Sequence, residues 1–141
     1  MSTRIDVYTC GDHQTPSSRL RWGNYSEEFL REGYDFSLRT ARHYVYKKVA
    51  MKRCVRKADV IIIQKVAFAP WVLRTFRKRT KRLILDLDDA IWLPNSSSKS
   101  NLVSFNKKLT KMWFFHSLPI YDKIIVSNLY LADFVKPSNN R

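Results

Sequence analysis

The stretch RLILDLDDAIW, residues 82–92, joins an apolar run to a cluster of acids. The apolar run and the polar loop that follows it predict a β-strand over residues 82–89. Asp86, Asp88 and Asp89 stand within four positions at the end of this strand, although the chain has only 12 acids against 26 Lys and Arg. Three of so few acids at one strand end indicate a local role, either structural or functional.

Segments of strand and helix character alternate along the rest of the 141 residues. Strict alternation with short connections predicts a parallel sheet with helices on both faces. We therefore expect one α/β domain over residues 1–141, a Rossmann-like, doubly wound parallel sheet of about five strands. The strands are expected over 4–10, 34–40, 59–66, 82–89 and 121–128, and the helices over 19–33, 41–58, 70–81, 102–117 and 129–135.

The carboxyl ends of parallel strands form the edge of the sheet at which ligands bind. Asp88 and Asp89 end one expected strand, and Ser127 and Asn128 end another. Ser127 and Asn128 either contact a ligand in this crevice or begin the next helix, because both residue types are good N-caps. Asp86 lies within its strand, so we expect it to point inward and to be hydrogen-bonded.

The loop GDHQTPSS, which follows the first expected strand, is a candidate phosphate cradle. Gly11 allows a close approach of the backbone, Ser17 and Ser18 offer hydroxyl donors, and Arg19 adds positive charge. An ordinary turn between a strand and a helix explains the same residues, since the chain has no GxGxxG motif. His13 is a further candidate in this loop, although a loop histidine is more often not catalytic.

The net charge of +14 predicts an acidic partner, which is a nucleic acid, an anionic membrane surface or a phosphorylated ligand. Residues 39–57 hold eight Lys or Arg and residues 74–82 hold six, with no acid in either segment. Cys10 and Cys54 are too few for a disulfide framework and lack CxxC spacing, and no metal pattern is present. The start of the chain has no signal-peptide character, so we expect a cytoplasmic protein.

Several segments, taken in order, resemble the N-terminal half of the family-four glycosyltransferases of the GT-B fold. They are TPSSRLR (15–21), ADVIIIQKV (58–66), PWVLRTFRKRTKRLILDLDDAIW (70–92) and YDKIIVSNLYLADF (121–134). The resemblance extends from about residue 4 to residue 135. It rests on the order of the segments rather than on one diagnostic motif.

The resemblance implies that residues 1–141 are the acceptor-side domain of an enzyme with two Rossmann-like domains. The C-terminal domain that binds the nucleotide-sugar donor is absent from this chain. Sugar transfer to a saccharide or lipid-linked acceptor would therefore need that domain or a partner chain that supplies it. The implied reaction is retaining and uses no cofactor besides the nucleotide-sugar co-substrate, and its setting is polysaccharide or glycolipid synthesis.

In such an enzyme, Asp88 and Asp89 would accept hydrogen bonds from acceptor hydroxyls or act as the catalytic base. The 11–19 loop would lie near the donor phosphates. Two other interpretations of the acid cluster remain open. Three close carboxylates suit a hard cation such as Mg²⁺. The letters DLDD are also similar to the motif of the haloacid-dehalogenase phosphatases, although Ala90 and the scarcity of later acids do not fit that family.

The two basic segments predict a surface that binds an anionic membrane, because cations and aromatic residues are interleaved in them. A non-catalytic basic module with this role is the alternative to the transferase. Nucleic acid is the less favoured partner, since no RNP, zinc-finger or helix-turn-helix signature is present. The protein would then lie on the inner face of the membrane, in contact through Lys48, Lys52, Arg56, Arg77 and Lys78.

Overall fold

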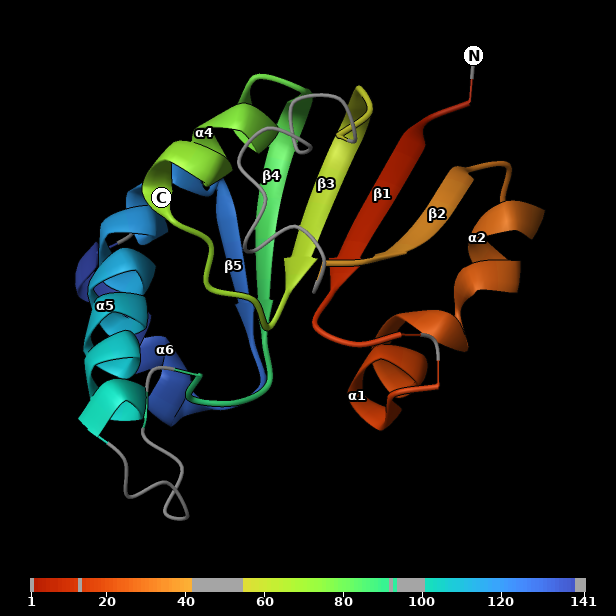
Figure 1. The fold of residues 1–141 in the computed structure, drawn as a ribbon. Coiled ribbons are helices and arrows are strands. Elements are labelled where there is room, and N and C mark those ends of the chain that lie inside the picture. Colours follow the sequence, from red (N-terminus) through yellow and green to blue (C-terminus); the bar gives the residue numbers. More distant parts are fainter. Residues whose placement is uncertain (1, 13, 42–54, 92, 94–100, 139–141) are drawn as a thin grey trace.

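The computed structural model describes residues 2–12, 14–41, 55–91, 93 and 101–138, and within 101–107 it describes the backbone alone. It contains a five-stranded, all-parallel sheet with the strand order β2-β1-β3-β4-β5, which confirms the expected α/β fold (Figure 1). The strands are β1 (Arg4–Thr9), β2 (Asp35–Thr40), β3 (Ala58–Gln64), β4 (Thr80–Leu87) and β5 (Lys123–Val126).

Helices cover both faces of this sheet, as in a doubly wound domain. Figure 1 shows α1 and α2 on one side of the strands and α4, α5 and α6 on the other. The helices are α1 (Pro16–Ser18), the π-helix η1 (Arg19–Gly23), α2 (Ser26–Arg31), α4 (Pro70–Arg77), α5 (Asn101–Ser117) and α6 (Leu129–Val135). Two short 3₁₀ turns, η2 (Leu118–Ile120) and η3 (Lys136–Ser138), follow α5 and α6.

Strand β4 shows how the sequence divides the core into two layers. Leu83, Leu85 and Leu87 are fully buried in the larger hydrophobic cluster, which contains residues of α4, α5 and α6. Because successive side chains of a strand point to opposite faces, Ile84 and Asp86 belong to the other face. Ile84 packs there in the smaller cluster, on the side of η1 and α2.

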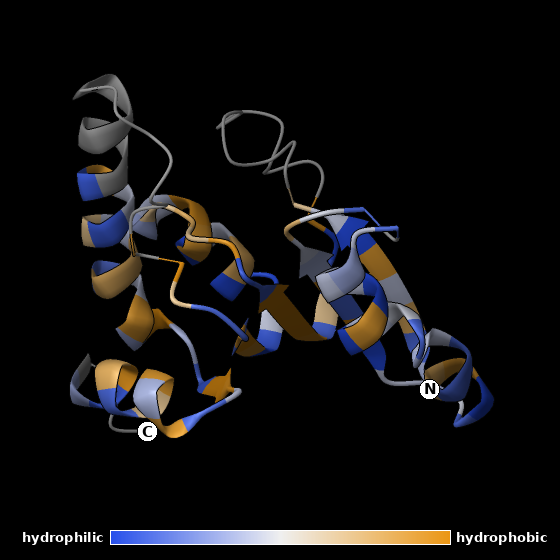
Figure 2. Ribbon diagram, turned by 90° about the horizontal axis from the view of Figure 1, so that it is seen from below, coloured by the Kyte–Doolittle hydropathy of each residue, from blue (hydrophilic) through white to orange (hydrophobic). Residues whose placement is uncertain are grey.

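The smaller cluster is built from Ile5, Val7 and Ile62, with the partly buried aromatic rings of Trp22 and Phe29 against it. Figure 2 shows hydrophobic residues in the central strands and a mixture of hydrophobic and hydrophilic residues in the helices on both sides of them. The order of the strands reverses between β1 and β3, because the chain goes from β1 to one side and then returns to the other. The crevice at such a reversal is where open parallel sheets bind ligands.

The boundaries of several elements differ from the expected ones. The single helix over 19–33 is instead divided into η1 and α2, and the chain leaves α2 through Gly33 with a φ of +83°. That value favours glycine, and Gly33 is also the last residue of the helix expected over 19–33. Most of the helix expected over 41–58 lies outside the described residues, but residues 55–57 are irregular and Ala58 already belongs to β3.

Helix α4 ends earlier than expected, and strand β4 is displaced towards the N-terminus. The helix expected over 70–81 ends at Arg77, and the strand expected over 82–89 runs from Thr80 to Leu87. Lys and Arg are good helix formers, yet backbone pairing of Ala58 with Thr80 makes this segment the start of β4. Asp88 and Asp89 therefore lie just beyond the strand.

Replacing Phe76 by alanine tests the larger core. Its ring is fully buried against the rings of Tyr8, at a centroid distance of 4.9 Å, and Phe68, at 5.2 Å. We expect Phe76→Ala to lower the free energy of unfolding by about 3–5 kcal/mol, measured by urea denaturation. The control Leu129→Ala removes a side chain that is 82% exposed and should change it by less than about 0.5 kcal/mol. Similar losses in both variants would contradict this core.

Candidate functional site

Asp86 lies at the centre of the polar cluster at the carboxyl edge of the sheet, and it is fully buried. The guanidinium of Arg21 donates to both of its oxygens, with Nε at 2.9 Å from Oδ2, and Nε1 of Trp22 donates to Oδ2 at 2.8 Å. The hydrogen bond to Asp86 raises the pKa of Arg21 above its ordinary value. Asp86 is thus an inward, hydrogen-bonded residue, and its partners come from η1.

Asp88 and Asp89 follow β4 and share one cation. Nζ of Lys65 lies 2.8 Å from Oδ2 of Asp89 and 3.5 Å from Oδ1 of Asp88. The Asp88 side chain is 22% exposed and its Oδ1 is buried, whereas that of Asp89 is 69% exposed, so Asp89 forms the part of this rim that is open to solvent. The expected placement of both carboxylates at the carboxyl edge is what the structure shows.

Lys65 is held in position by its backbone. It follows β3 directly, its N–H donates to the carbonyl of Asp86 at 2.9 Å, and its φ of 55° is unusual for a residue other than glycine. Burial lowers the pKa of its amine, but the hydrogen bond to Asp89 and the charges of both carboxylates outweigh burial and raise it overall. The side chain therefore stays an ammonium at neutral pH, between the two acids.

The loop that follows β1 is closed on itself. A Cβ atom on Gly11 would meet Oγ1 of Thr15 at 2.1 Å, so Thr15 fills the space that the glycine leaves. The carboxylate of Asp12 accepts hydrogen bonds from the backbone N–H groups of Gln14 and Thr15, each at 3.0 Å. This turn starts α1 and accounts for the Gly, Asp and Thr of the loop.

The candidate donors of this loop differ in their access to solvent. Ser18 is fully buried, and its hydroxyl is directed to the carbonyl of Gly11 at 3.5 Å. Ser17 is partly buried, and its carbonyl accepts a hydrogen bond from Nε2 of Gln64 at 2.8 Å. Arg19 is exposed. The loop is thus tied to the end of β3, while His13 lies outside the described residues.

Ser127 and Asn128 reach the same edge as Asp88. The Ser127 hydroxyl donates to the carbonyl of Asp88 at 3.1 Å. The Asn128 side chain accepts a hydrogen bond from the backbone N–H of Leu131 at 2.9 Å, which makes it the N-cap of α6. The Asn128 amide also donates to the Ser127 hydroxyl at 3.4 Å. Both residues therefore help to fix the turn that presents Asp88.

Of the five expected membrane cations, Arg56, Arg77 and Lys78 lie within the described residues. Arg56 and Lys78 are exposed, and Lys48 and Lys52 lie outside the described residues. Arg77 donates to Asp122 at 3.3 Å and to the carbonyl of Thr80 at 3.1 Å, so it helps to connect α4 to the start of β5. Lys78 and Arg77 stand at the amino edge of the sheet, opposite the carboxylates.

Residues that sequence reasoning did not single out complete the site. They are Lys65, Gln64 and Trp22, and each bonds to a residue that comes from another strand or loop. A signal for Lys65 exists, since it comes two residues after the apolar run VIII (60–63) and must therefore lie at the carboxyl edge. Nothing in the local sequence reveals that Trp22 reaches Asp86.

A cavity lies beside the ion pair of Asp86 and Arg21. Its volume is about 410 Å³, and it runs along η1 and α2. Its lining joins aromatic rings to polar groups: Arg21, Trp22, Tyr25, Glu28, Phe29, Glu32 and Tyr34. Within the described part of the chain, no group of three His, Cys, Asp or Glu side chains is arranged to hold a metal ion. No helix there combines the length and apolar character that crossing a membrane requires.

Comparisons with known proteins leave the family of this chain open. No family model matches it, and no curated protein matches it. A solved structure, a conserved protein from Enterococcus faecalis V583, is similar over 97% of this chain and 99% of its own. Its sequence identity is 12% and its TM-score is 0.39, and we draw no conclusion from a likeness of that size.

Replacing Asp86 by asparagine tests the buried ion pair. Asp86→Asn keeps the shape of the side chain but leaves the Arg21 guanidinium without its countercharge. We expect the free energy of unfolding to fall by about 2–4 kcal/mol in urea denaturation. The matched change Asp89→Asn alters an exposed ion pair and should cost less than about 1 kcal/mol. If the two variants are equally stable, Asp86 does not organise this edge.

Proposed function

We propose that this chain is the acceptor-side domain of a retaining GT-B glycosyltransferase, and that Asp88 and Asp89 bind the acceptor. The observation that supports this best is the pair of carboxylates around Lys65, at the carboxyl edge of an all-parallel sheet. That edge is where open α/β sheets bind ligands. The ordered sequence resemblance described above supplies the reaction class, which is sugar transfer from a nucleotide-sugar.

The chemistry of the pair suits a saccharide. Hydroxyl groups of a sugar both donate and accept hydrogen bonds, and the rim offers carboxylate acceptors beside an ammonium donor. Asp89 is the more exposed carboxylate, so it is the one better placed to accept a proton from the acceptor hydroxyl. Lys65 would then hold both acids in position for that step.

The cavity along η1 and α2 supports a saccharide acceptor as well. Tyr25 is 50% exposed and Tyr34 is 38% exposed, and both line this cavity together with Glu28 and Glu32. Small-molecule sites are mostly apolar or aromatic, with a few polar groups that fix orientation. A sugar chain bound at Asp88 and Asp89 would find such a surface next to Arg21.

Glycan binding by the chain on its own tests this proposal. We expect the wild-type protein to bind immobilised oligosaccharides on a glycan array. The variant Asp88→Ala, Asp89→Ala should bind them about tenfold or more weakly, because two charged hydrogen-bond acceptors are lost. Asp133→Ala, which removes an exposed carboxylate from α6, is the matched control and should bind as wild type does. Unchanged binding in the double variant would refute the acceptor role.

Transfer itself needs the donor domain, which a fused second domain or a partner chain would supply. In that two-domain protein, we expect the same double variant to lose most of its activity and Asp133→Ala to keep it. If the double variant were as active as the wild-type protein, Asp88 and Asp89 would have no role in the mechanism. An open reading frame downstream that encodes a second Rossmann-like domain would identify the source of the donor site.

We also propose that the basic surface holds the protein reversibly on the inner, cytoplasmic face of a membrane. The exposed side chains of Arg56 and Lys78 favour this, and each basic residue near an anionic bilayer contributes on the order of 1 kcal/mol. This surface is also the feature that favours the alternative function, a non-catalytic module for anionic membranes. The two functions differ at Asp88 and Asp89, which such a module would not need.

Sedimentation with liposomes tests the membrane role. We expect the chain to sediment with phosphatidylglycerol liposomes at low salt and to be released at about 1 M salt, where the screening length falls to roughly 3 Å. Phosphatidylcholine liposomes, which carry no net charge, are the control and should leave the protein in solution. Failure to sediment with phosphatidylglycerol at low salt would rule out this association.

A further inference from the structure

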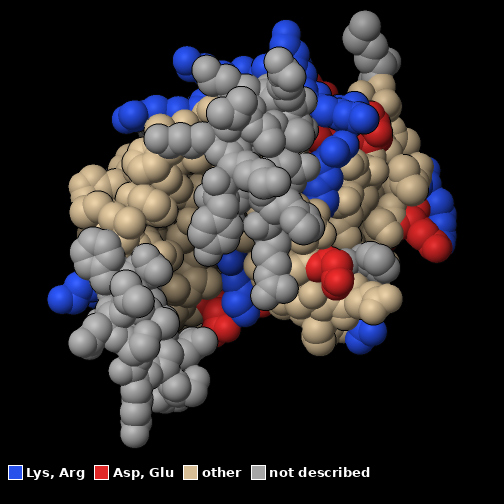
Figure 3. Space-filling view, viewed as in Figure 1, with Lys and Arg blue, Asp and Glu red and all other residues tan. Residues whose placement is uncertain are grey.

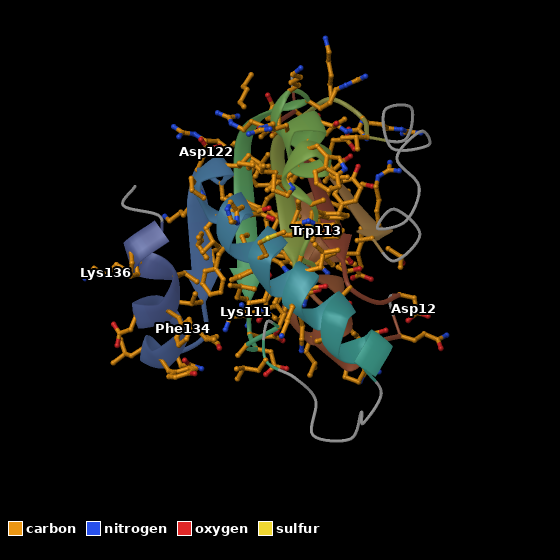
Figure 4. All side chains as sticks on the ribbon, turned by 60° about the vertical axis from the view of Figure 1, so that its left-hand side comes forward. Asp12, Lys111, Trp113, Asp122, Phe134 and Lys136 are labelled. Carbon is orange, nitrogen blue, oxygen red and sulfur yellow. The ribbon has the colours of Figure 1, made fainter. Side chains whose placement is uncertain are left out.

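Cations gather at the amino edge of the sheet, opposite the candidate acceptor site. Figure 3 shows Lys and Arg side chains collected at the end of the molecule where β3 and β4 begin. Figure 4 gives the orientation, with Asp122 at this end of the sheet and Asp12 at the other. An open cavity of about 410 Å³ lies among these cations, between the starts of β1, β3 and β4.

The cavity is lined by five cations and one acid. The cations are Arg4, Lys57, Lys78, Arg79 and Lys81, and the acid is Asp59. They come from three neighbouring strands and from the turn between α4 and β4, so the fold brings together residues that are up to 77 positions apart. Thr80, whose hydroxyl donates to the carbonyl of Asp59 at 3.1 Å, ties β4 to β3 at this point.

Asp59 neutralises only part of this charge. Its carboxylate lies 2.7 Å from Nζ of Lys81 and accepts a hydrogen bond from the backbone N–H of Arg4 at 2.9 Å. The hydrogen bond from Lys81 lowers the pKa of Asp59, so this acid stays ionised and holds Lys81 in place. Lys57 and Lys78 are exposed, and neither has an ion-pair partner within the described residues.

The dipole of α4 does not explain this cluster. Helix α4 ends at Arg77, so Lys78 and Arg79 stand at its negative end, where cations are favoured. That effect falls off within one turn of the helix end, and it has no bearing on Arg4 or Lys57, which precede or begin strands. Acids offset part of the mutual repulsion of these cations. Asp59 pairs with Lys81 at 2.7 Å, and Arg4 pairs with Asp6 at 3.1 Å and with Asp35 at 3.4 Å.

We propose that this cavity is a binding site for phosphate groups, of a size that accepts a diphosphate. Phosphate oxygens accept short, charge-assisted hydrogen bonds from Lys and Arg, and Arg adds a planar, bidentate fork. The volume lies within the range of small-molecule sites, which is roughly 300–1,000 Å³. The site is distinct from the acceptor edge, because it stands at the opposite end of β4.

Calorimetric titration of the full chain with inorganic pyrophosphate tests the site. We expect the variant Lys57→Gln, Lys78→Gln to bind about tenfold more weakly than wild type, because two charge-assisted contacts are lost. The control Lys108→Gln, Lys111→Gln removes the same charge from exposed positions on α5, which Figure 4 shows at Lys111, and should bind as wild type does. Equal losses in both variants, or no binding by wild type at low salt, would overturn the proposal.

Amide chemical shifts of the wild-type protein give a readout that does not depend on a variant. We expect pyrophosphate to shift the amides of residues 57–59 and 78–81 and to leave those of α5 unchanged. Shifts that follow all surface cations alike would show diffuse attraction and would contradict a site. Asp88 and Asp89 are intact throughout, so failure here leaves the acceptor proposal untouched, and failure there leaves this site untouched.

Vesicles distinguish a lipid headgroup from a soluble phosphate. If pyrophosphate releases the protein from phosphatidylglycerol vesicles, the site takes headgroup phosphates. If pyrophosphate binds and these vesicles do not, the ligand is soluble. Two results together would contradict the cavity as the point of contact. Saturating pyrophosphate would leave vesicle binding unchanged, and the two double lysine variants would reduce vesicle binding equally.

Discussion

The fully buried carboxylate of Asp86 is the constraint on which the carboxyl edge depends. A charge without water is stable only when partners satisfy it, and here the partners are the guanidinium of Arg21 and the indole N–H of Trp22. Both belong to η1, which follows β1, whereas Asp86 belongs to β4. The pair therefore fastens the first helical segment across the end of β3, and Gln64 adds a second tie through the carbonyl of Ser17.

This constraint explains why three acids stand so close together. Asp86 is used for the fold, because it lies on the inner face of the strand and its bonds are directed to η1. Asp88 and Asp89 come after the strand ends and remain at the rim, where Lys65 is their nearest cation. One short segment thus supplies the bond that orders the edge and the carboxylates that the edge presents. The Ser127 hydroxyl and the Asn128 cap secure the turn beside them.

Sequence patterns were sufficient to predict the strands and their parallel direction, because buried parallel strands have continuous apolar runs such as VIII (60–63) in β3. They also placed the carboxylates and Gly33. They failed where two propensities compete: Lys and Arg after Arg77 favour a helix, but pairing with β3 makes Thr80 and Lys81 part of β4. They could not find contacts between distant segments, such as Arg21 with Asp86 and Lys65 with Asp89, because each partner alone looks like an exposed polar residue.

Strand β4 has cations at its amino end and carboxylates at its carboxyl end. Its length sets the distance between the two groups. Seven steps of about 3.3 Å each separate Lys81 from Asp88, which places them roughly 23 Å apart. A molecule held on a membrane by its amino edge would therefore carry the proposed acceptor site well away from the bilayer. A lipid-linked acceptor would have to reach that far through its own sugar chain, whereas a soluble saccharide would meet no such limit. Under the proposed transferase role, this distance would favour a long or soluble acceptor whenever lipid occupies the basic edge.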